Sequence, residues 1–407
     1  MKEILKDPVL FLMALSILVA CTSVGSSLIT AAIFMITVVM ILFKHNFKPL
    51  RSRSVALYFS FVAIAVIYAG FGKGTLSSAS FRMCTFTFIY MISVFVMSYH
   101  LKTLNSKQTA GLMKVAFVAL LFSIIGTTAV SFIDPMAVRI YGFGDMEDVD
   151  FEIANRYHSM GMMSYSLAHA FSVVAVGLSV LVFRAPQKWL KIISAVLLAL
   201  TIRLLFIMTI TTALLLAVIG IAIVFANYFS KGRVVITISL TVAALVIFFL
   251  AGFATIFLDF SSNLNAEITK KLVDLFSFAE TGVASGQAGY RKELYMASFK
   301  TFLSNPLFGW GSDNGSRQFI GEHSYILDYL AYYGVFASLL FISWYREYFY
   351  FKPILSKRLR SDYIFSFIPV AGLCAMKGYS VCGSLPFMSL ILIQLFFQYL
   401  MNSVKKV

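Results

Sequence analysis

Two side chains in the segment 289–334 combine the chemistry of a general base with that of an anion clamp. His323 carries an imidazole, whose neutral form can take a proton from a hydroxyl group. Arg291 stays positively charged and offers forked N–H donors that fit phosphate or diphosphate oxygens. A base beside such a cation predicts transfer from a phosphate-activated donor to an alcohol, provided that both side chains face one pocket.

Each of these two residues also has a purely structural interpretation. A single histidine at a membrane surface can simply bond a backbone carbonyl, and a single arginine there can face lipid headgroups. The presence of His323 and Arg291 together in one polar segment, between long apolar runs, is what favours the catalytic interpretation.

Other polar side chains are candidates for substrate binding. From Tyr325 onward, hydroxyl and carboxyl groups recur at helical spacing, which predicts a helix with one polar, aromatic face. Arg203 lies in an apolar run, where a charge either binds an anion or reaches the headgroups. We interpret Lys377 and His169 as structural. The predicted substrate-binding set is Arg291, Arg203, Tyr290, Tyr325, Asp328 and Arg317, with His323 as the catalytic base.

The rest of the chain has the composition of a polytopic membrane protein. Of its 407 residues 60% are hydrophobic and only 13% are charged, which is outside the range of soluble domains. The formal charge of +15 does not indicate nucleic acid, because in a membrane protein the placement of Lys and Arg decides topology. The four cysteines have no metal-ligand spacing. We predict an all-α fold that uses no cofactor and no metal.

About twelve apolar runs are long enough to cross a bilayer. Alternate loops are consistently basic, which predicts cytoplasmic N- and C-termini. The predicted division is residues 1–257 with helices 1–9, residues 258–323 as a large external loop with short helices, and residues 324–407 with helices 10–12. The runs lie near residues 8–24, 26–43, 54–71, 83–99, 112–132, 159–183, 190–207, 209–229, 234–257, 324–343, 362–380 and 384–402.

Two loops on the external side are long enough to contribute to a site. Residues 133–158 are acidic and are either a solvated loop or one wall of a polar groove. In the second loop, residues 265–276 have the spacing of an amphipathic helix. A further helix is expected from about 292 to 303, since Asn305–Pro306 disfavours its continuation. Glycines before and after that helix, among them Gly286, Gly289 and Gly309, predict a permissive chain at both ends.

Three features of this region, in this order, resemble the O-antigen polymerase and O-antigen ligase superfamily of Wzy-type and WaaL-type membrane glycosyltransferases. They are Gly289–Arg291, the turn Asn305–Gly311, and the spacing of His323 to Gly334. The resemblance implies a multi-pass protein of the bacterial inner membrane whose donor is a glycan on undecaprenyl pyrophosphate. It also implies that Arg291 holds the pyrophosphate and that His323 activates the acceptor hydroxyl. The implied partners are the lipid-linked oligosaccharide, the bilayer and a chain-length regulator, and not nucleic acid.

The chain departs from the family pattern at one position. A second arginine is expected in an earlier Thr-x-Thr/Ser-Arg-Ala-like stretch, but the matching residues here run from Thr209 to Ala213 with Thr212 in its place. Arg203, two to three helical turns away, is the candidate substitute.

The sequence leaves three functions open. The leading one is a polymerase of O-antigen or capsule, which adds a lipid-linked chain to the hydroxyl of an incoming repeat unit. A ligase that uses lipid A core as acceptor would need nearly the same residues. A flippase for lipid-linked oligosaccharides, or a sugar transporter, fits about twelve spans equally well, but the chain has no obvious two-half repeat.

Overall fold

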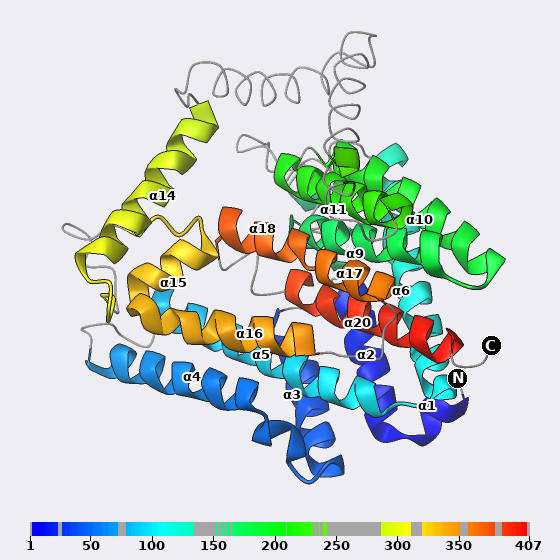
Figure 1. Cartoon of the computed structure of the whole chain (residues 1–407), viewed down its shortest axis with the longest axis horizontal. Helices are drawn as coiled ribbons and strands as arrows, with labels where there is room; N and C mark the ends of the chain where they lie inside the picture. The colour runs from blue at the N-terminus through cyan, green and yellow to red at the C-terminus, as the bar shows by residue number, and fades with distance from the viewer. Residues whose placement is uncertain are drawn as a thin grey trace.

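The structure is a computed structural model that describes residues 2–22, 27–71, 79–133, 152–153, 156–157, 159–160, 162, 165–208, 210–230, 236, 239–241, 286–310, 320–350, 357–378 and 385–404. Within these ranges every regular element is a helix (Figure 1). The predicted all-α class is therefore confirmed for the described part of the chain. The predicted amphipathic helix at 265–276 and most of the acidic loop at 133–158 lie outside it.

The first half of the described chain runs through helices that follow the predicted apolar runs. They are α1 (Lys2–Lys6), α2 (Pro8–Thr22), α3 (Ser27–Lys44), η1 (Lys48–Arg51), α4 (Arg53–Phe71), α5 (Ala79–Thr103), α6 (Ser106–Ile133), α9 (Tyr165–Arg184), α10 (Lys188–Ile207) and α11 (Thr211–Ser230).

The second half contains shorter and more often interrupted helices. They are α14 (Gly286–Ser304), α15 (Tyr325–Tyr333), η3 (Gly334–Phe336), α16 (Ala337–Tyr350), α17 (Lys357–Phe365), α18 (Ile368–Met376) and α20 (Leu385–Val404). The predicted run 362–380 is thus divided between α17 and α18. Pro369 lies in the first turn of α18, where its missing N–H breaks no helical hydrogen bond.

Five helical stretches of the described chain are long and apolar enough to cross a membrane. They are Ser106–Ile133, Ser166–Arg184, Lys188–Ile207, Thr212–Ser230 and Tyr325–Ser343, and shorter apolar helices accompany them. Together they make the chain a multi-pass membrane protein. The twelve-helix count, the three-part division and the orientation stay predictions, since run 234–257 falls almost entirely outside the described residues.

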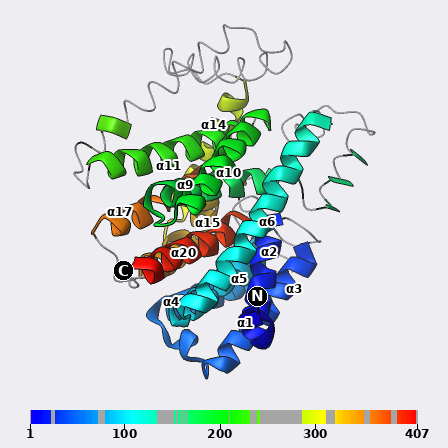
Figure 2. The ribbon, with the colours of Figure 1, turned by 90° about the vertical axis from the view of Figure 1, so that its right-hand side faces the viewer.

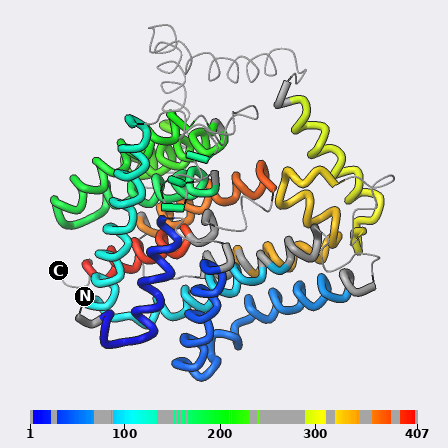
Figure 3. Tube along the Cα trace, turned by 180° about the vertical axis from the view of Figure 1, so that it is seen from behind, coloured from blue at the N-terminus to red at the C-terminus, as the bar shows by residue number. Residues whose placement is uncertain are grey.

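Helix α9 lies at the centre of the main bundle. It contacts α10, α11 and α20, and α20 in turn contacts α5 and α6 (Figure 2). Helix α14 lies on one flank of the molecule and packs against α15, whereas α10 and α11 lie on the opposite flank (Figures 1 and 3). A site built on α14 and α15 therefore adjoins the bundle around α9 through α18, which contacts α15, α11 and α9.

The predicted run 324–343 is not one continuous helix. α15 ends at Tyr333, because Gly334 has a φ of +59° and the chain continues as the short helix η3. The break is shaped by the turn after α14: a Cβ added at Gly334 would lie 2.4 Å from the Leu307 carbonyl oxygen. The Val335 N–H donates to Pro306 O at 2.8 Å. A tertiary contact with residues 306–309 thus interrupts an otherwise suitable helical sequence.

Helix α14 ends at Ser304, close to where Asn305–Pro306 predicts its end, but it begins earlier than expected. Gly286 is the first residue of the helix and Gly289 lies in its first turn, rather than in a loose segment before it. A glycine in the interior of a helix costs about 1 kcal/mol relative to alanine. Packing of α14 against α15 is a tertiary contact that can offset this cost.

Candidate functional site

One face of α14 is turned toward the segment that carries His323. Leu294 and Ser298 are buried, and with Arg291 and Tyr295 they follow the spacing i, i+3, i+4, i+7 of a single helix face. The backbone of Gly321 lies directly on this face, since an added Cβ would be 2.4 Å from Leu294 O. Arg291 therefore occupies the same side of α14 as the residues that contact segment 320–324.

His323 lies just before α15 and not within it. Ser324 is the N-cap of α15, and its side chain accepts a hydrogen bond from the Leu327 N–H at 3.3 Å. The His323 side chain is exposed, and its Nδ1 lies 2.9 Å from the carbonyl oxygen of Gly321. A carbonyl can only accept, so Nδ1 of the neutral ring carries the proton and Nε2 keeps a lone pair. This arrangement leaves Nε2 able to accept a proton.

Tyr290 and His323 are neighbours across the gap between α14 and segment 320–324. Their ring centroids are 6.4 Å apart with the planes at 83°, an edge-to-face geometry. The Tyr290 side chain is 61% exposed, so its ring remains open to a further partner. Arg291 is the next residue in α14, so its backbone adjoins this contact, and we call the place where Tyr290, Arg291 and His323 adjoin the junction.

Tyr295 ties this junction to the end of α18. Its hydroxyl donates to Met376 O at 2.9 Å. Burial raises the pKa of the Tyr295 phenol above its usual value of 10.0, and the nearby charge of Arg291 opposes the shift only in part. Tyr295 therefore stays protonated at neutral pH and acts as a donor. A second hydrogen bond reaches the residue after Met376: the Tyr325 N–H donates to Lys377 O at 2.8 Å.

Tyr325 and Asp328, two of the predicted substrate-binding residues, are enclosed by protein. Tyr325 is fully buried, and its ring lies 4.7 Å from that of Tyr329. Asp328 is 1% exposed and accepts hydrogen bonds from the Ser298 hydroxyl and the Ser324 N–H. The polar, aromatic face of α15 is thus packed inward in this structure, and neither side chain lies on a surface open to a substrate.

Arg203 is held on a different flank of the molecule. Its Nη1 donates to Ser131 Oγ at 3.0 Å, and its guanidinium carbon lies 4.2 Å from the centre of the Phe132 ring. Both partners are on α6, and Figures 1 and 3 show α10 far from α14. The structure therefore does not bring Arg203 to His323. Arg317 lies outside the described residues.

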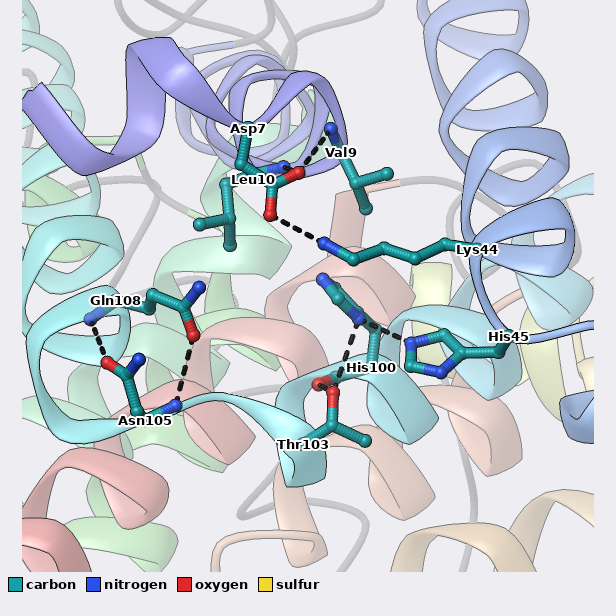
Figure 4. A network of polar contacts seen from close by, with 9 residues as sticks. All are labelled: Asp7, Val9, Leu10, Lys44, His45, His100, Thr103, Asn105 and Gln108. Carbon is teal, nitrogen blue, oxygen red and sulfur yellow. Dashed lines mark hydrogen bonds and ion pairs between the residues drawn. The ribbon is translucent and has the colours of Figure 1, made fainter.

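A second polar network lies on the predicted cytoplasmic side, where α2, α3 and α5 meet (Figure 4). Asp7 pairs with Lys44 at 2.5 Å and caps the start of α2 by accepting from Val9 N at 3.0 Å. Next to this pair, His45 Nε2 lies 2.8 Å from His100 Nδ1. His100 is 1% exposed, and its Nε2 has no hydrogen-bond partner among the described residues. No group of three or more His, Cys, Asp or Glu that could hold a metal occurs in the described ranges.

Sequence reasoning missed the residues that join α14 to segment 320–324. Ser298 donates to Asp328 and accepts from the Gly321 N–H at 2.9 Å. The signal was present, because Ser298 stands seven residues after Arg291, on the same helix face. A lone serine in an apolar helix, however, more often bonds its own backbone, as Ser343 does with Leu340 O.

Comparison with known sequences supports the resemblance inferred from the motifs. Residues 196–342 match the family described as O-antigen ligase. No curated protein sequence matches the chain at a significant level. The matched range contains the C-terminal part of α10 and the whole of α11, α14 and α15, and so it includes Tyr290, Arg291 and His323. The predicted resemblance to the polymerase and ligase superfamily is confirmed for this part of the chain.

Proposed function

We propose that this protein, whose residues 196–342 are similar to the O-antigen ligase family, is a polymerase of a bacterial surface polysaccharide. It transfers a glycan chain from undecaprenyl pyrophosphate to a hydroxyl group of an incoming lipid-linked repeat unit. The reaction takes place on the outer face of the inner membrane, where the predicted topology puts α14 and His323.

In the proposed reaction His323 is the base and Arg291 is the diphosphate clamp. Nε2 of His323 takes the proton of the acceptor hydroxyl as the oxygen forms a bond to the anomeric carbon of the donor sugar. The bond between that carbon and the diphosphate oxygen breaks, and the diphosphate leaves with the bonding electrons. The guanidinium of Arg291 stabilises the negative charge that grows on this leaving group.

The observation that carries the proposal is the arrangement of the His323 ring. Its Nδ1 is bonded to Gly321 O, its Nε2 is left with a lone pair, and its ring lies 6.4 Å from that of Tyr290 beside Arg291. The exposed Tyr290 ring offers an apolar face on which a sugar can stack. Base, cation and aromatic platform are thus contributed by two adjoining segments of chain.

The test is polymerisation by purified protein supplied with the lipid-linked substrate. His323→Ala and Arg291→Ala should each lower the rate by roughly 10²–10⁴-fold, the range expected for loss of a general base or of charge stabilisation. Lys292→Ala is the matched control, because it removes a positive charge from the exposed side of the same helix turn. Wild-type chain growth by both His323→Ala and Arg291→Ala would refute the assignment.

The family description itself favours a second candidate, an O-antigen ligase that transfers the glycan to lipid A core. The same base and cation would serve that acceptor, so the two activities differ in what binds opposite His323. A deletion strain separates them. Lipid A core that still carries a single repeat unit indicates a polymerase, whereas loss of every capped form indicates a ligase.

The proposed transfer uses side chains of the protein for both proton removal and charge stabilisation, and so it needs no metal. Addition of a chelator to the purified enzyme should leave the rate unchanged. A rate that falls with chelation and recovers with one divalent cation would contradict this part of the proposal.

A further inference from the structure

A single buried serine links the helix that carries Arg291 to the segment that carries His323. Ser298 has no exposed surface. Its hydroxyl donates to Asp328 Oδ1 at 2.7 Å and accepts from the Gly321 N–H at 2.9 Å. A hydroxyl has one proton to give and two lone pairs, so it can make both bonds at once.

The Asp328 carboxylate extends this link to the start of α15. Its Oδ2 accepts from the Ser324 N–H at 3.1 Å, while its Oδ1 accepts from Ser298. Buried carboxylates are costly unless their oxygens are hydrogen-bonded, and here each oxygen has a partner on a different segment. Asp328 therefore bridges α14 and the N-terminus of α15.

These bonds fix the backbone on both sides of His323. The Gly321 N–H is held by Ser298, the Gly321 carbonyl holds the His323 ring, and the Ser324 N–H is held by Asp328. Arg291 lies seven residues before Ser298, about two turns or 10 Å along α14. The distance from the cation to the base thus depends on the bonds of Ser298 and Asp328.

We propose that Ser298 and Asp328 are positioning residues of the transfer site. They set the separation and orientation of Arg291 and His323 and do not contact the substrate. This assignment rests on the proposed function, and it gives Asp328 a different role from the substrate binding expected from the sequence.

The contacts also predict which kinetic constant will change. Nδ1 of His323 is bonded to Gly321 O and not to Asp328, so loss of Asp328 leaves the tautomer of the base intact. A base and a clamp that are displaced by about 1 Å lose alignment in the transition state, which can cost up to about 10²-fold in rate. Variants of the link should therefore lower kcat and leave KM for the lipid-linked donor and the pH profile of kcat nearly unchanged.

The kinetic test compares Ser298→Ala with Ser343→Ala. Both serines are fully buried, but among the described residues the Ser343 hydroxyl bonds only Leu340 O of its own helix, so its loss should leave kcat unchanged. Ser298→Ala should lower kcat by about 10-fold to 100-fold. Asp328→Asn keeps one acceptor oxygen and should lower it less, and the double variant should be no worse than Ser298→Ala, since both belong to one network.

A second measurement does not depend on activity. With Tyr290→Cys and His323→Cys in the full-length protein, a short bifunctional thiol reagent should join α14 to segment 320–324, with His323→Cys alone as the control. Adding Ser298→Ala should reduce the cross-linked fraction several-fold, whereas adding Ser343→Ala should not.

The outcomes separate this inference from the proposed function. If His323→Ala is inactive but Ser298→Ala retains wild-type kcat and cross-linking, the positioning role is wrong and the proposed function stands. If His323→Ala is fully active while Ser298→Ala loosens the cross-link, the link is structural and the proposed reaction is wrong. A rise in KM with unchanged kcat in Asp328→Asn would assign Asp328 to substrate binding instead.

Discussion

His323 and the His45–His100 pair use their ring nitrogens in opposite ways. At His323 the partner is a backbone carbonyl, which can only accept, so Nδ1 is fixed as a donor and Nε2 keeps a lone pair that can accept a proton. In the pair, each ring is the partner of the other, and either nitrogen can be the donor. The comparison shows how a histidine is prepared to act as a base: an acceptor such as a carbonyl holds the N–H of one ring nitrogen, and the other nitrogen keeps its lone pair.

The surroundings of the two sites reinforce the difference. Burial lowers the pKa of His45 from its usual 6.5, and the charges of Lys44 and Lys48 lower it further. Protonation of His45 would also place a cation against the buried ring of His100. The pair is therefore arranged to stay neutral and to hold α3 against α5, whereas His323 is exposed beside an arginine-bearing helix.

The largest expected effect tests the role of Nε2 directly. His323→Gln keeps an N–H that can reach Gly321 O but has no group that takes a proton at neutral pH. We expect the transfer rate to fall by roughly 10²–10⁴-fold. His45→Gln, measured in the same assay, should leave the rate unchanged. Equal losses in both variants would mean that the two histidine environments do not differ in the way described.

The next effect concerns the break between α15 and η3. Gly334→Ala puts a side chain at a φ of +59° and 2.4 Å from a backbone oxygen, which should destabilise the protein by roughly 2–5 kcal/mol. Gly111→Ala is the control, because the atoms nearest to its added Cβ are side-chain atoms of Ile4, at 3.2 and 3.3 Å. Thermal unfolding in detergent measures the loss. Amide hydrogen exchange should become faster in residues 323–333 and not in residues 45–51. Equal increases in both segments would show that the two histidine regions do not unfold independently.

A smaller effect is expected from removal of one member of the cytoplasmic pair. His45→Ala removes the 2.8 Å partner of the buried His100 Nδ1 and leaves it the Thr103 hydroxyl at 3.4 Å, which should cost about 0.5–1.5 kcal/mol. The unfolding temperature should fall while the specific activity of the folded protein is retained. An unchanged unfolding temperature would show that the pair adds nothing to the packing of α3 on α5.

The smallest effect is the pH dependence of stability. The pKa of His45 is lower in the folded protein than its unfolded value of 6.5, so below pH 6.5 the unfolded chain binds the proton more readily. The contribution of His45 to the free energy of unfolding is complete above pH 6.5 and is lost as the pH falls toward the pKa of His45 in the folded protein. Unfolding temperatures between pH 8 and 5 should therefore decline more steeply for the wild type than for His45→Gln. Parallel curves would assign the dependence to other groups.

Much of the fold could be predicted because its physical basis is local. Apolar runs fix where helices lie in a membrane, and Asn305–Pro306 correctly predicted the end of α14 within a residue or two. The junction of Tyr290, Arg291 and His323 follows from one segment of sequence. The orientation of the His323 ring could be seen only in the structure, since nothing in the sequence indicates that its Nδ1 donates to the Gly321 carbonyl.

The missed features depend on contacts between distant segments. The spacing of His323 and Gly334 is compatible with an unbroken helix, and only the packing of Leu307 against Gly334 shows that α15 stops. The inward direction of Asp328 is set by Ser298 on another helix. The placement of Arg203 on Ser131 and Phe132 likewise depends on α6, 70 or so residues away in sequence.

The nine residues of α15 set the distance between two points that are held by contacts at either end of the helix. At one end Ser324 caps the helix beside His323, and at the other Gly334 is seated on the Leu307 turn. Inserting one residue would rotate the two ends against each other by about 100° and lengthen the helix by about 1.5 Å. Substitutions within α15 can therefore be tolerated where packing allows, but an insertion or deletion that changes the length of the helix cannot.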